Sequence, residues 1–228
     1  MEIAERYSKI NKEAKELATS TVNLVVISKS FPLNFIKPLI DLGHLHFGEN
    51  KLQEAVIKWS EFIIKNSNIK LHMVGKLQSN KVPEAVNLFS YIHSLDSEKL
   101  AVRLFEAEKK YGKKLKYFIQ INIGEESQKS GIPKISTHDF IHFCSNELKL
   151  NIIGLMCIPP INVDPTKYFY ELKQIASHEK LNELSMGMSN DYKIAIQSCS
   201  TFIRIGSAIF GKREKRRSEE HTSELQSH

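Results

Sequence analysis

The sequence predicts an α/β fold, a single (β/α)8 barrel with one extra helix at its N-terminus. Eight short apolar runs recur along the 228 residues, and longer segments of helical period lie between them. No linker or break in composition divides the chain before residue 211. Strands that alternate with helices form a parallel sheet, and eight such units are enough to close a barrel. An open, doubly wound sheet is the alternative architecture.

The predicted strands are apolar runs of five to nine residues, bounded by polar or glycine-containing segments. They begin at Val22, His44, Ile69, Tyr91, Lys116, Leu150, Glu183 and Phe202. Between them, apolar residues fall three and four positions apart, as one buried helix face requires. The clearest helical segments are 34–43, 50–66, 97–112 and 165–182, after a leading helix at about residues 3–18. Gly43 and Gly112 stand where helices end.

One domain is expected over residues 1–211, followed by a basic tail over 212–228. The last twelve residues, 217–228, read RSEEHTSELQSH. They resemble the translation of a sequencing-library adapter, so we interpret them as a non-native segment and exclude them from the fold. The formal charge is +6, but the lysines are scattered and mostly lie beside acidic residues. This pattern is typical of a solvated surface and does not predict a nucleic-acid partner.

The three cysteines are Cys144, Cys157 and Cys199, an odd number with no metal-ligand or redox spacing. The N-terminal segment is charged and amphipathic and lacks the apolar core of a signal peptide. No apolar stretch is long enough to span a bilayer. We therefore expect a cytoplasmic protein without a bound metal or a membrane partner.

Side chains that do chemistry in such barrels lie at the C-terminal ends of the strands. Lys29 directly follows the first strand, so its amine is expected at the mouth of the barrel. Burial lowers the pKa of a lysine there, which suits Schiff-base formation. A strand-end lysine that reaches solvent is the other interpretation. Further residues are expected at the mouth from the ends of strands two, three, five and seven: 48–50, His72, Gly75, Asn122 and 185–189.

The loops after strands seven and eight often bind phosphate in these barrels. Here they contain Ser189, Gly206 and Ser207. Gly206 lets the backbone approach a phosphate, and the two hydroxyls lie next to backbone N–H donors. Asp191, by contrast, is expected to cap the following helix. Arg204 lies within the buried eighth strand and needs a partner, which is either a structural carboxylate or a ligand atom.

Seven blocks carry a resemblance to a known family. They are VVISKSFP, HFGENKLQEA, LHMVGKLQSNK, QINIGEESQKSG, IIGLMCIPP, LSMGMSND and FIRIGSAIFG, in this order from Val22 to Gly211. Together they resemble the pyridoxal phosphate homeostasis protein family. The segments GEN, GKLQSNK and RIGSAIFG are the most specific.

The resemblance implies a barrel like the N-terminal domain of alanine racemase, with pyridoxal 5′-phosphate (PLP) as cofactor at its C-terminal mouth. It implies that Lys29 holds PLP as a Schiff base, that Asn50 lies beside the ring and that Arg204 faces the pyridine nitrogen. The implied phosphate cradle consists of Met188, Ser189, Gly206 and Ser207.

Two parts of the pattern need comment. Ser207 stands where many relatives have threonine, which retains the hydroxyl. Four residues match a family block whose role cannot be derived from the sequence: His72, Gln78, Asn80 and Lys81. We expect them to order the mouth of the barrel rather than contact the cofactor.

The expected function is PLP binding in intracellular vitamin B6 homeostasis. The protein would be a monomeric carrier or buffer that passes PLP to apo PLP-dependent enzymes, without substantial catalysis. One alternative is a PLP-dependent amino-acid racemase. Another is a class I aldolase-like barrel that uses a Schiff-base lysine and no cofactor.

Overall fold

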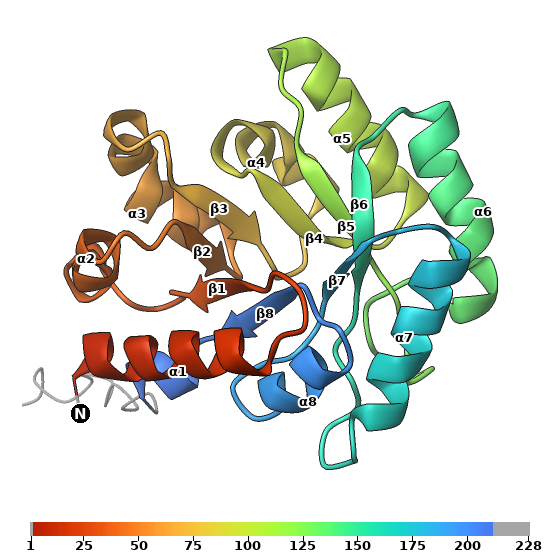
Figure 1. Ribbon diagram of the computed structural model, residues 1–228. Helices are drawn as coiled ribbons and strands as arrows, with labels where there is room; N and C mark the ends of the chain where they lie inside the picture. Colours follow the sequence, from red (N-terminus) through yellow and green to blue (C-terminus); the bar gives the residue numbers. More distant parts are fainter. Residues whose placement is uncertain (1, 212–228) are drawn as a thin grey trace, which may run out of the picture.

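The computed structural model describes residues 2–211, and the eight strands form a closed, all-parallel barrel in the order β1 to β8. The strands are β1 (Asn23–Ile27), β2 (His46–Glu49), β3 (Lys70–Met73), β4 (Tyr91–Leu95), β5 (Lys116–Gln120), β6 (Ile152–Met156), β7 (Glu183–Ser185) and β8 (Phe202–Ile205). β1 pairs with β8 over four residues, which closes the barrel. All eight predicted strands are confirmed, and the closed sheet excludes the doubly wound alternative (Figure 1).

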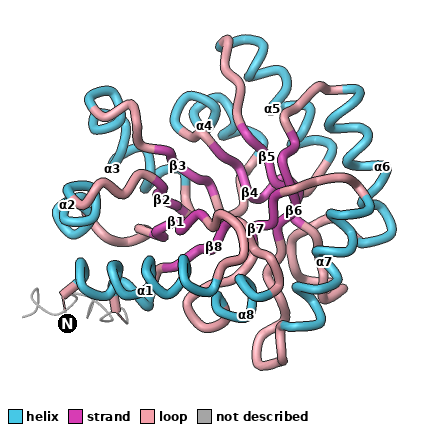
Figure 2. Tube along the Cα trace, in the orientation of Figure 1, coloured by secondary structure: helices cyan, strands magenta, loops and turns pink. Residues whose placement is uncertain are grey.

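The helices surround the strands, as Figure 2 shows in cyan and magenta. They are α1 (Ile3–Leu17), α2 (Leu33–Asp41), α3 (Leu52–Lys65), α4 (Val82–Leu88), α5 (Glu98–Tyr111), α6 (Thr137–His142), α7 (Thr166–His178), α8 (Tyr192–Gln197) and α9 (Ser207–Phe210). Gly43 and Gly112 have positive φ values of 83° and 61° and end α2 and α5, as expected.

The extra helix α1 completes the outer ring. It packs against α2, α8 and α9 (Figure 1). Tyr7, Ile10 and Ala14 are its buried residues, at steps of three and four. The leading helix predicted for residues 3–18 is thus confirmed to within one residue.

Alternate residues of each strand face the helices or the barrel interior. The outer layer contains the larger apolar core, with Phe47, Trp59, Leu71, Tyr117 and Phe169 among its fully buried side chains. A smaller apolar cluster fills part of the interior and consists of Val25, Ile27, Tyr91, Phe118, Met156 and Phe202. The rest of the interior is polar, and this polar part leads to the candidate site.

The predicted basic tail, including the segment 217–228, lies outside the described residues and stays a prediction. Within residues 2–211, no helix is both long and apolar enough to cross a membrane. In the same range, His, Cys, Asp and Glu side chains do not gather in any group of three that could hold a metal ion.

Candidate binding site at the barrel mouth

A cavity of about 400 Å³ lies at the carboxyl ends of the strands. Four of the seven predicted site residues line it, namely Lys29, Asn50, Met188 and Arg204. Its wall also contains apolar side chains, such as Ile27 and Ile158, and polar ones from the end of β5. A largely apolar cavity with a few converging polar groups is the usual form of a small-molecule site.

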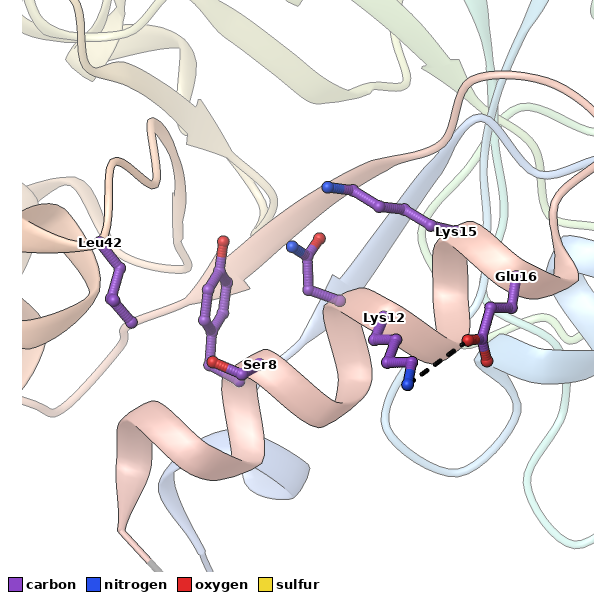
Figure 3. Close-up of a pocket in the computed structure, with 7 residues that line it drawn as sticks. Ser8, Lys12, Lys15, Glu16 and Leu42 are labelled. Atoms are coloured by element: carbon purple, nitrogen blue, oxygen red, sulfur yellow. Dashed lines mark ion pairs between the residues drawn. The ribbon is translucent and has the colours of Figure 1, made fainter.

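A second hollow makes a useful contrast. It has a volume of about 520 Å³ and lies between α1 and the end of α2, on the outside of the helix ring (Figure 3). Its lining includes Lys12 and Glu16, an exposed ion pair at 3.8 Å, and Leu42. None of the predicted site residues lies there. The barrel mouth is therefore the candidate site.

Lys29 is half-buried and directly follows β1. The turn that carries it is fixed by the carbonyl oxygen of Ser28, which accepts hydrogen bonds from the Phe31 amide at 3.1 Å and from Lys58 Nζ at 2.7 Å. Ser30 has a φ of 67°, a conformation that non-glycine residues rarely adopt and that often marks functional sites. The backbone on both sides of Lys29 is thereby held in place.

A buried charge cluster lies behind this turn. Glu49 has no exposed surface, and its Oε1 accepts hydrogen bonds from Ser28 Oγ at 2.7 Å, Lys58 Nζ at 2.8 Å and Trp59 Nε1 at 3.0 Å. The cluster lies between the barrel wall and α3, so the expectation that Glu49 belongs to the mouth is wrong. Because side chains alternate along a strand, Glu49 must point away from the side on which Asn50 lines the cavity.

The backbone at Asn50, which lines the cavity, lies very close to the chain after β3. A Cβ atom on Gly75 would lie 2.1 Å from the carbonyl oxygen of Asn50. Only glycine allows the chain after β3 to pass so near the chain after β2.

Arg204 is a buried cation, with only 4% of its surface exposed. Its Nη1 donates to Ser185 Oγ at 2.6 Å, and its Nη2 donates to the carbonyl oxygen of Cys157 at 2.9 Å. Burial lowers the pKa of the Arg204 guanidinium from its ordinary value, yet a guanidinium stays protonated in proteins. Burial raises the pKa of the Cys157 thiol to about 12, so this neighbour is neutral.

No carboxylate of residues 2–211 lies within ion-pair distance of Arg204. The structural carboxylate considered from the sequence is therefore not found in that range. An unpaired buried cation is costly. Since Arg204 lines the cavity, an electron-rich or anionic ligand there would compensate its charge.

The remaining predicted residues lie next to the cavity rather than in its lining. Ser189 Oγ accepts hydrogen bonds from the backbone amides of Gly206 at 3.3 Å and Ala208 at 3.2 Å. Ser207 is exposed at the start of α9. Two backbone N–H groups thus converge on one hydroxyl at the β8–α9 turn, an arrangement that suits phosphate oxygens.

Asp191 requires a partial correction. It occupies the N-cap position of α8, as expected, but its side chain makes no capping hydrogen bond to that helix. Its carboxylate instead accepts from the backbone amide of Met188 at 2.6 Å. Asp191 therefore fixes the loop that carries Met188 and Ser189.

His72 also differs from expectation, because it does not lie at the mouth. It is fully buried inside the barrel, where its ring nitrogens contact His46 and His93, both at 2.9 Å. Ser185 is among the polar residues that the end of strand seven predicts for the mouth, whereas His46 and His93 are not predicted from the sequence. The signal that could have identified them is the alternation of side chains along a strand, because each of these residues lies on the inward-facing side of its strand. Gln78 and Asn80 line a neighbouring hollow of about 530 Å³ beside Lys76.

Comparisons with known proteins identify the family to which the chain belongs. The profile of the alanine racemase N-terminal domain family matches residues 9–214. The pyridoxal phosphate homeostasis protein of Pasteurella multocida is 38% identical over 205 residues, covering 86% of this chain and 88% of that protein. The chain belongs to the pyridoxal phosphate homeostasis protein family. The family resemblance inferred from the sequence blocks is confirmed.

A second relative and two solved structures extend the comparison. The Vibrio cholerae homeostasis protein is 36% identical over 207 residues, covering 86% of this chain and 88% of that protein. The solved structure of PipY from Synechococcus elongatus, with PLP bound, has a TM-score of 0.83 and 32% identity, covering 92% of this chain and all of that one. Alanine racemase from E. faecalis has a TM-score of 0.68 at 14% identity, which shows a shared fold only.

Proposed function

We propose that this protein binds PLP at the barrel mouth and acts in PLP homeostasis as a carrier or buffer. The observation that supports this most directly is the meeting, in one cavity of about 400 Å³, of the Lys29 amine and the buried Arg204 cation, which has no carboxylate of residues 2–211 at ion-pair distance. PLP offers a group for each: an aldehyde for the lysine and an electron-rich ring nitrogen for the guanidinium. Membership of the homeostasis family supports the same ligand.

In this proposal each residue has one role. The Lys29 amine holds the aldehyde carbon as a Schiff base, with loss of water. Arg204 faces the ring nitrogen and Asn50 lies beside the ring. The phosphate is held at the β7 and β8 loops by Met188, Ser189, Gly206 and Ser207.

The carrier role is favoured over a racemase by the charge at Arg204. PLP supplies an electron sink in enzymes, and the sink is strongest when its ring nitrogen is protonated. A permanently charged guanidinium at that nitrogen disfavours protonation. We expect only trace conversion of alanine or serine by the PLP-loaded protein, far below the roughly 10 s⁻¹ typical of enzymes. Turnover near that rate, lost in Lys29→Ala, would establish the racemase alternative instead.

The ligand and its attachment point are tested by loading the protein with PLP, reducing it with borohydride and mapping the label. We expect one equivalent of label, on Lys29. Lys76 and Lys129 also line the cavity and supply the control variants. Lys76→Arg and Lys129→Arg should retain the label, whereas Lys29→Arg should lose it. Label mainly on either control lysine would overturn the assignment. A protein that takes up no PLP would overturn the proposed function, and the aldolase alternative would then be tested with carbonyl substrates.

A further inference from the structure

A chain of four hydrogen bonds crosses the interior of the barrel and ends on Arg204. His46 Nδ1 lies 2.9 Å from His72 Nε2, and His72 Nδ1 lies 2.9 Å from His93 Nε2. His93 Nδ1 lies 2.7 Å from Ser185 Oγ, which lies 2.6 Å from Arg204 Nη1. The residues come from β2, β3, β4, β7 and β8, so the chain links strands across the barrel. We call these five residues the histidine relay.

The relay is shielded from water along most of its length. His72, His93 and Ser185 have no exposed surface. Tyr91 stacks on His72 with ring centroids 4.2 Å apart, and Phe118 stacks on His93 at 4.4 Å. These contacts hold both imidazole rings in one orientation. Burial, and then the charge of Arg204, lower the pKa of His93 well below its ordinary value, so its ring is neutral.

The chemistry of Arg204 fixes the direction of every bond in the relay. A guanidinium can only donate, so Ser185 Oγ accepts from it. The Ser185 hydroxyl hydrogen then has one acceptor among the described contacts, which is His93 Nδ1. It follows that His93 carries its hydrogen on Nε2 and donates to His72 Nδ1.

The same reasoning extends to the far end. His72 also carries its hydrogen on Nε2 and donates to His46 Nδ1. The reverse direction would leave the Ser185 hydroxyl hydrogen buried without an acceptor, at a cost that buried polar groups rarely bear. The relay therefore has one internally consistent arrangement, in which all bonds run from Arg204 towards His46.

We propose that the histidine relay is a positioning device for Arg204. His93 accepts the Ser185 hydroxyl hydrogen and so orients it away from the guanidinium, which leaves a lone pair of Ser185 Oγ for Arg204 Nη1; the Cys157 carbonyl holds the other nitrogen. The relay thus fixes the position of the guanidinium in the cavity. It thereby fixes how close the positive charge lies to the ring of a bound cofactor. This inference rests on the proposed PLP site for its consequence, but the bond directions concern the unloaded protein alone.

The bond directions are tested by NMR of unloaded protein labelled with ¹⁵N-histidine. We expect His72 and His93 to show a protonated Nε2 and an unprotonated Nδ1, each in a single tautomer. A hydrogen on Nδ1 of either ring, or a cationic ring near pH 7, would overturn the proposal.

The positioning role is tested with Ser185→Ala, together with Ser185→Thr, which keeps the hydroxyl. In Ser185→Ala the tautomers of His93 and His72 should become mixed, since nothing sets them. The absorption maximum of bound PLP should shift, and PLP should dissociate about tenfold more readily, as expected for the loss of one charge-assisted contact. Ser185→Thr should restore the single tautomers and the absorption maximum.

Ser200→Ala is the matched control. Ser200 is also a buried serine, 3% exposed, but its hydroxyl donates to the Met186 carbonyl and lies outside the relay. Ser200→Ala should leave the tautomers of His72 and His93 and the absorption spectrum of bound PLP unchanged. Equal PLP spectra and affinities in wild type and Ser185→Ala would overturn the positioning role alone. A wild-type protein that binds no PLP would instead overturn the proposed function, with the tautomers still readable.

Discussion

Buried charges are handled differently in the two layers of this barrel. Between the barrel wall and the helices they are paired: Glu49 with Lys58 at 2.8 Å, and Glu108 with Lys114 at 3.0 Å. Inside the barrel no carboxylate of the described part of the chain lies within ion-pair distance of Arg204; its hydrogen-bond partners are neutral, and Asp191 acts on it only from farther away. The outer charges are satisfied by the protein itself, whereas the inner one is left for a ligand. The interior is thus built for binding at some cost in stability.

The largest expected effect is the loss of stability in acid. Burial lowers the pKa of His44 to about 4, from an ordinary value of 6.5, and lowers those of His72 and His93 well below it. All three stay neutral in the folded protein but become protonated in the unfolded chain below about pH 6.5. The stability they contribute is therefore present above that pH and is lost as pH falls. Near pH 5 the slope should approach about 4 kcal/mol per pH unit, from roughly three protons taken up on unfolding.

Denaturant unfolding at several pH values measures this slope. Variants then separate the contribution of the histidine outside the barrel from that of the histidines inside it. His72 and His93 lie inside the barrel, whereas His44 lies outside it and contacts Tyr7 of α1. His44→Gln should remove about one proton from the uptake and leave that of the interior histidines, to which His46 also contributes because burial lowers its pKa. His142, exposed on α6, is the control position, and His142→Gln should change nothing. Stability that is flat down to about pH 5 would show that the interior histidines are not held neutral.

The next effect comes from breaking an outer pair. Lys58→Met leaves Glu49 buried without its cation and should lower the free energy of unfolding by about 3–5 kcal/mol. Lys12→Met is the control, because Lys12 and Glu16 form an ion pair on α1 in which 77% and 63% of the two side chains are exposed. Removal of Lys12 should cost less than about 1 kcal/mol. If both variants lowered the free energy of unfolding by a similar amount, the ion pair in the Glu49 cluster would contribute no more to stability than a surface ion pair.

The outer layer was also the part most accessible to prediction. Apolar periodicity gave the eight strands, and the glycines at 43 and 112 gave two helix ends, because these depend on local sequence. The strand ends indicated Lys29 and Asn50 as residues of the mouth, but left open whether Lys29 reaches solvent and which partner Arg204 has. The family resemblance added Met188 and the expected roles of all four residues towards the cofactor.

The polar interior could not be predicted, because it depends on strand register. Whether His72 reaches the mouth or bonds to His93 depends on how β3 is shifted against β4. The partner of Arg204 lies 19 positions away on β7, at a distance that no local pattern encodes. Asp191 was predicted as a helix cap from its type, but the choice between the helix and the Met188 amide is made by loop geometry.

A third prediction concerns the charge of Arg204 inside the barrel, which bound PLP is expected to compensate. PLP at about a hundredfold excess over its dissociation constant should raise the free energy of unfolding by about 2.7 kcal/mol. At the same PLP concentration, the gain should be smaller in Arg204→Gln, because the ring nitrogen loses its cation. Arg204→Lys keeps a charge and should recover part of the gain. Equal stabilisation of all three proteins, measured by denaturant unfolding, would show that the ligand does not meet Arg204.

The smallest expected effect comes from Ser207, which tests the phosphate end of PLP separately from its ring and aldehyde. Ser207 is exposed at the start of α9, and within residues 2–211 its hydroxyl makes no recorded hydrogen bond. Ser207→Ala should therefore leave the stability of the unloaded protein within about 0.5 kcal/mol of wild type. If the hydroxyl donates to the phosphate, PLP binding should weaken by about 1.5 kcal/mol, roughly tenfold. Pyridoxal lacks the phosphate, so its affinity should not change.

Comparing the two ligands isolates the phosphate end, because both carry the same aldehyde and ring. Ser127→Ala, in an exposed loop after β5, is the control and should alter neither affinity. A bulky residue at Gly206 should act in the same direction as Ser207→Ala, since a Cβ there would already lie 3.3 Å from Ile27, which lines the cavity. Equal losses for PLP and pyridoxal would mean that the β8–α9 turn shapes the cavity but does not hold the phosphate.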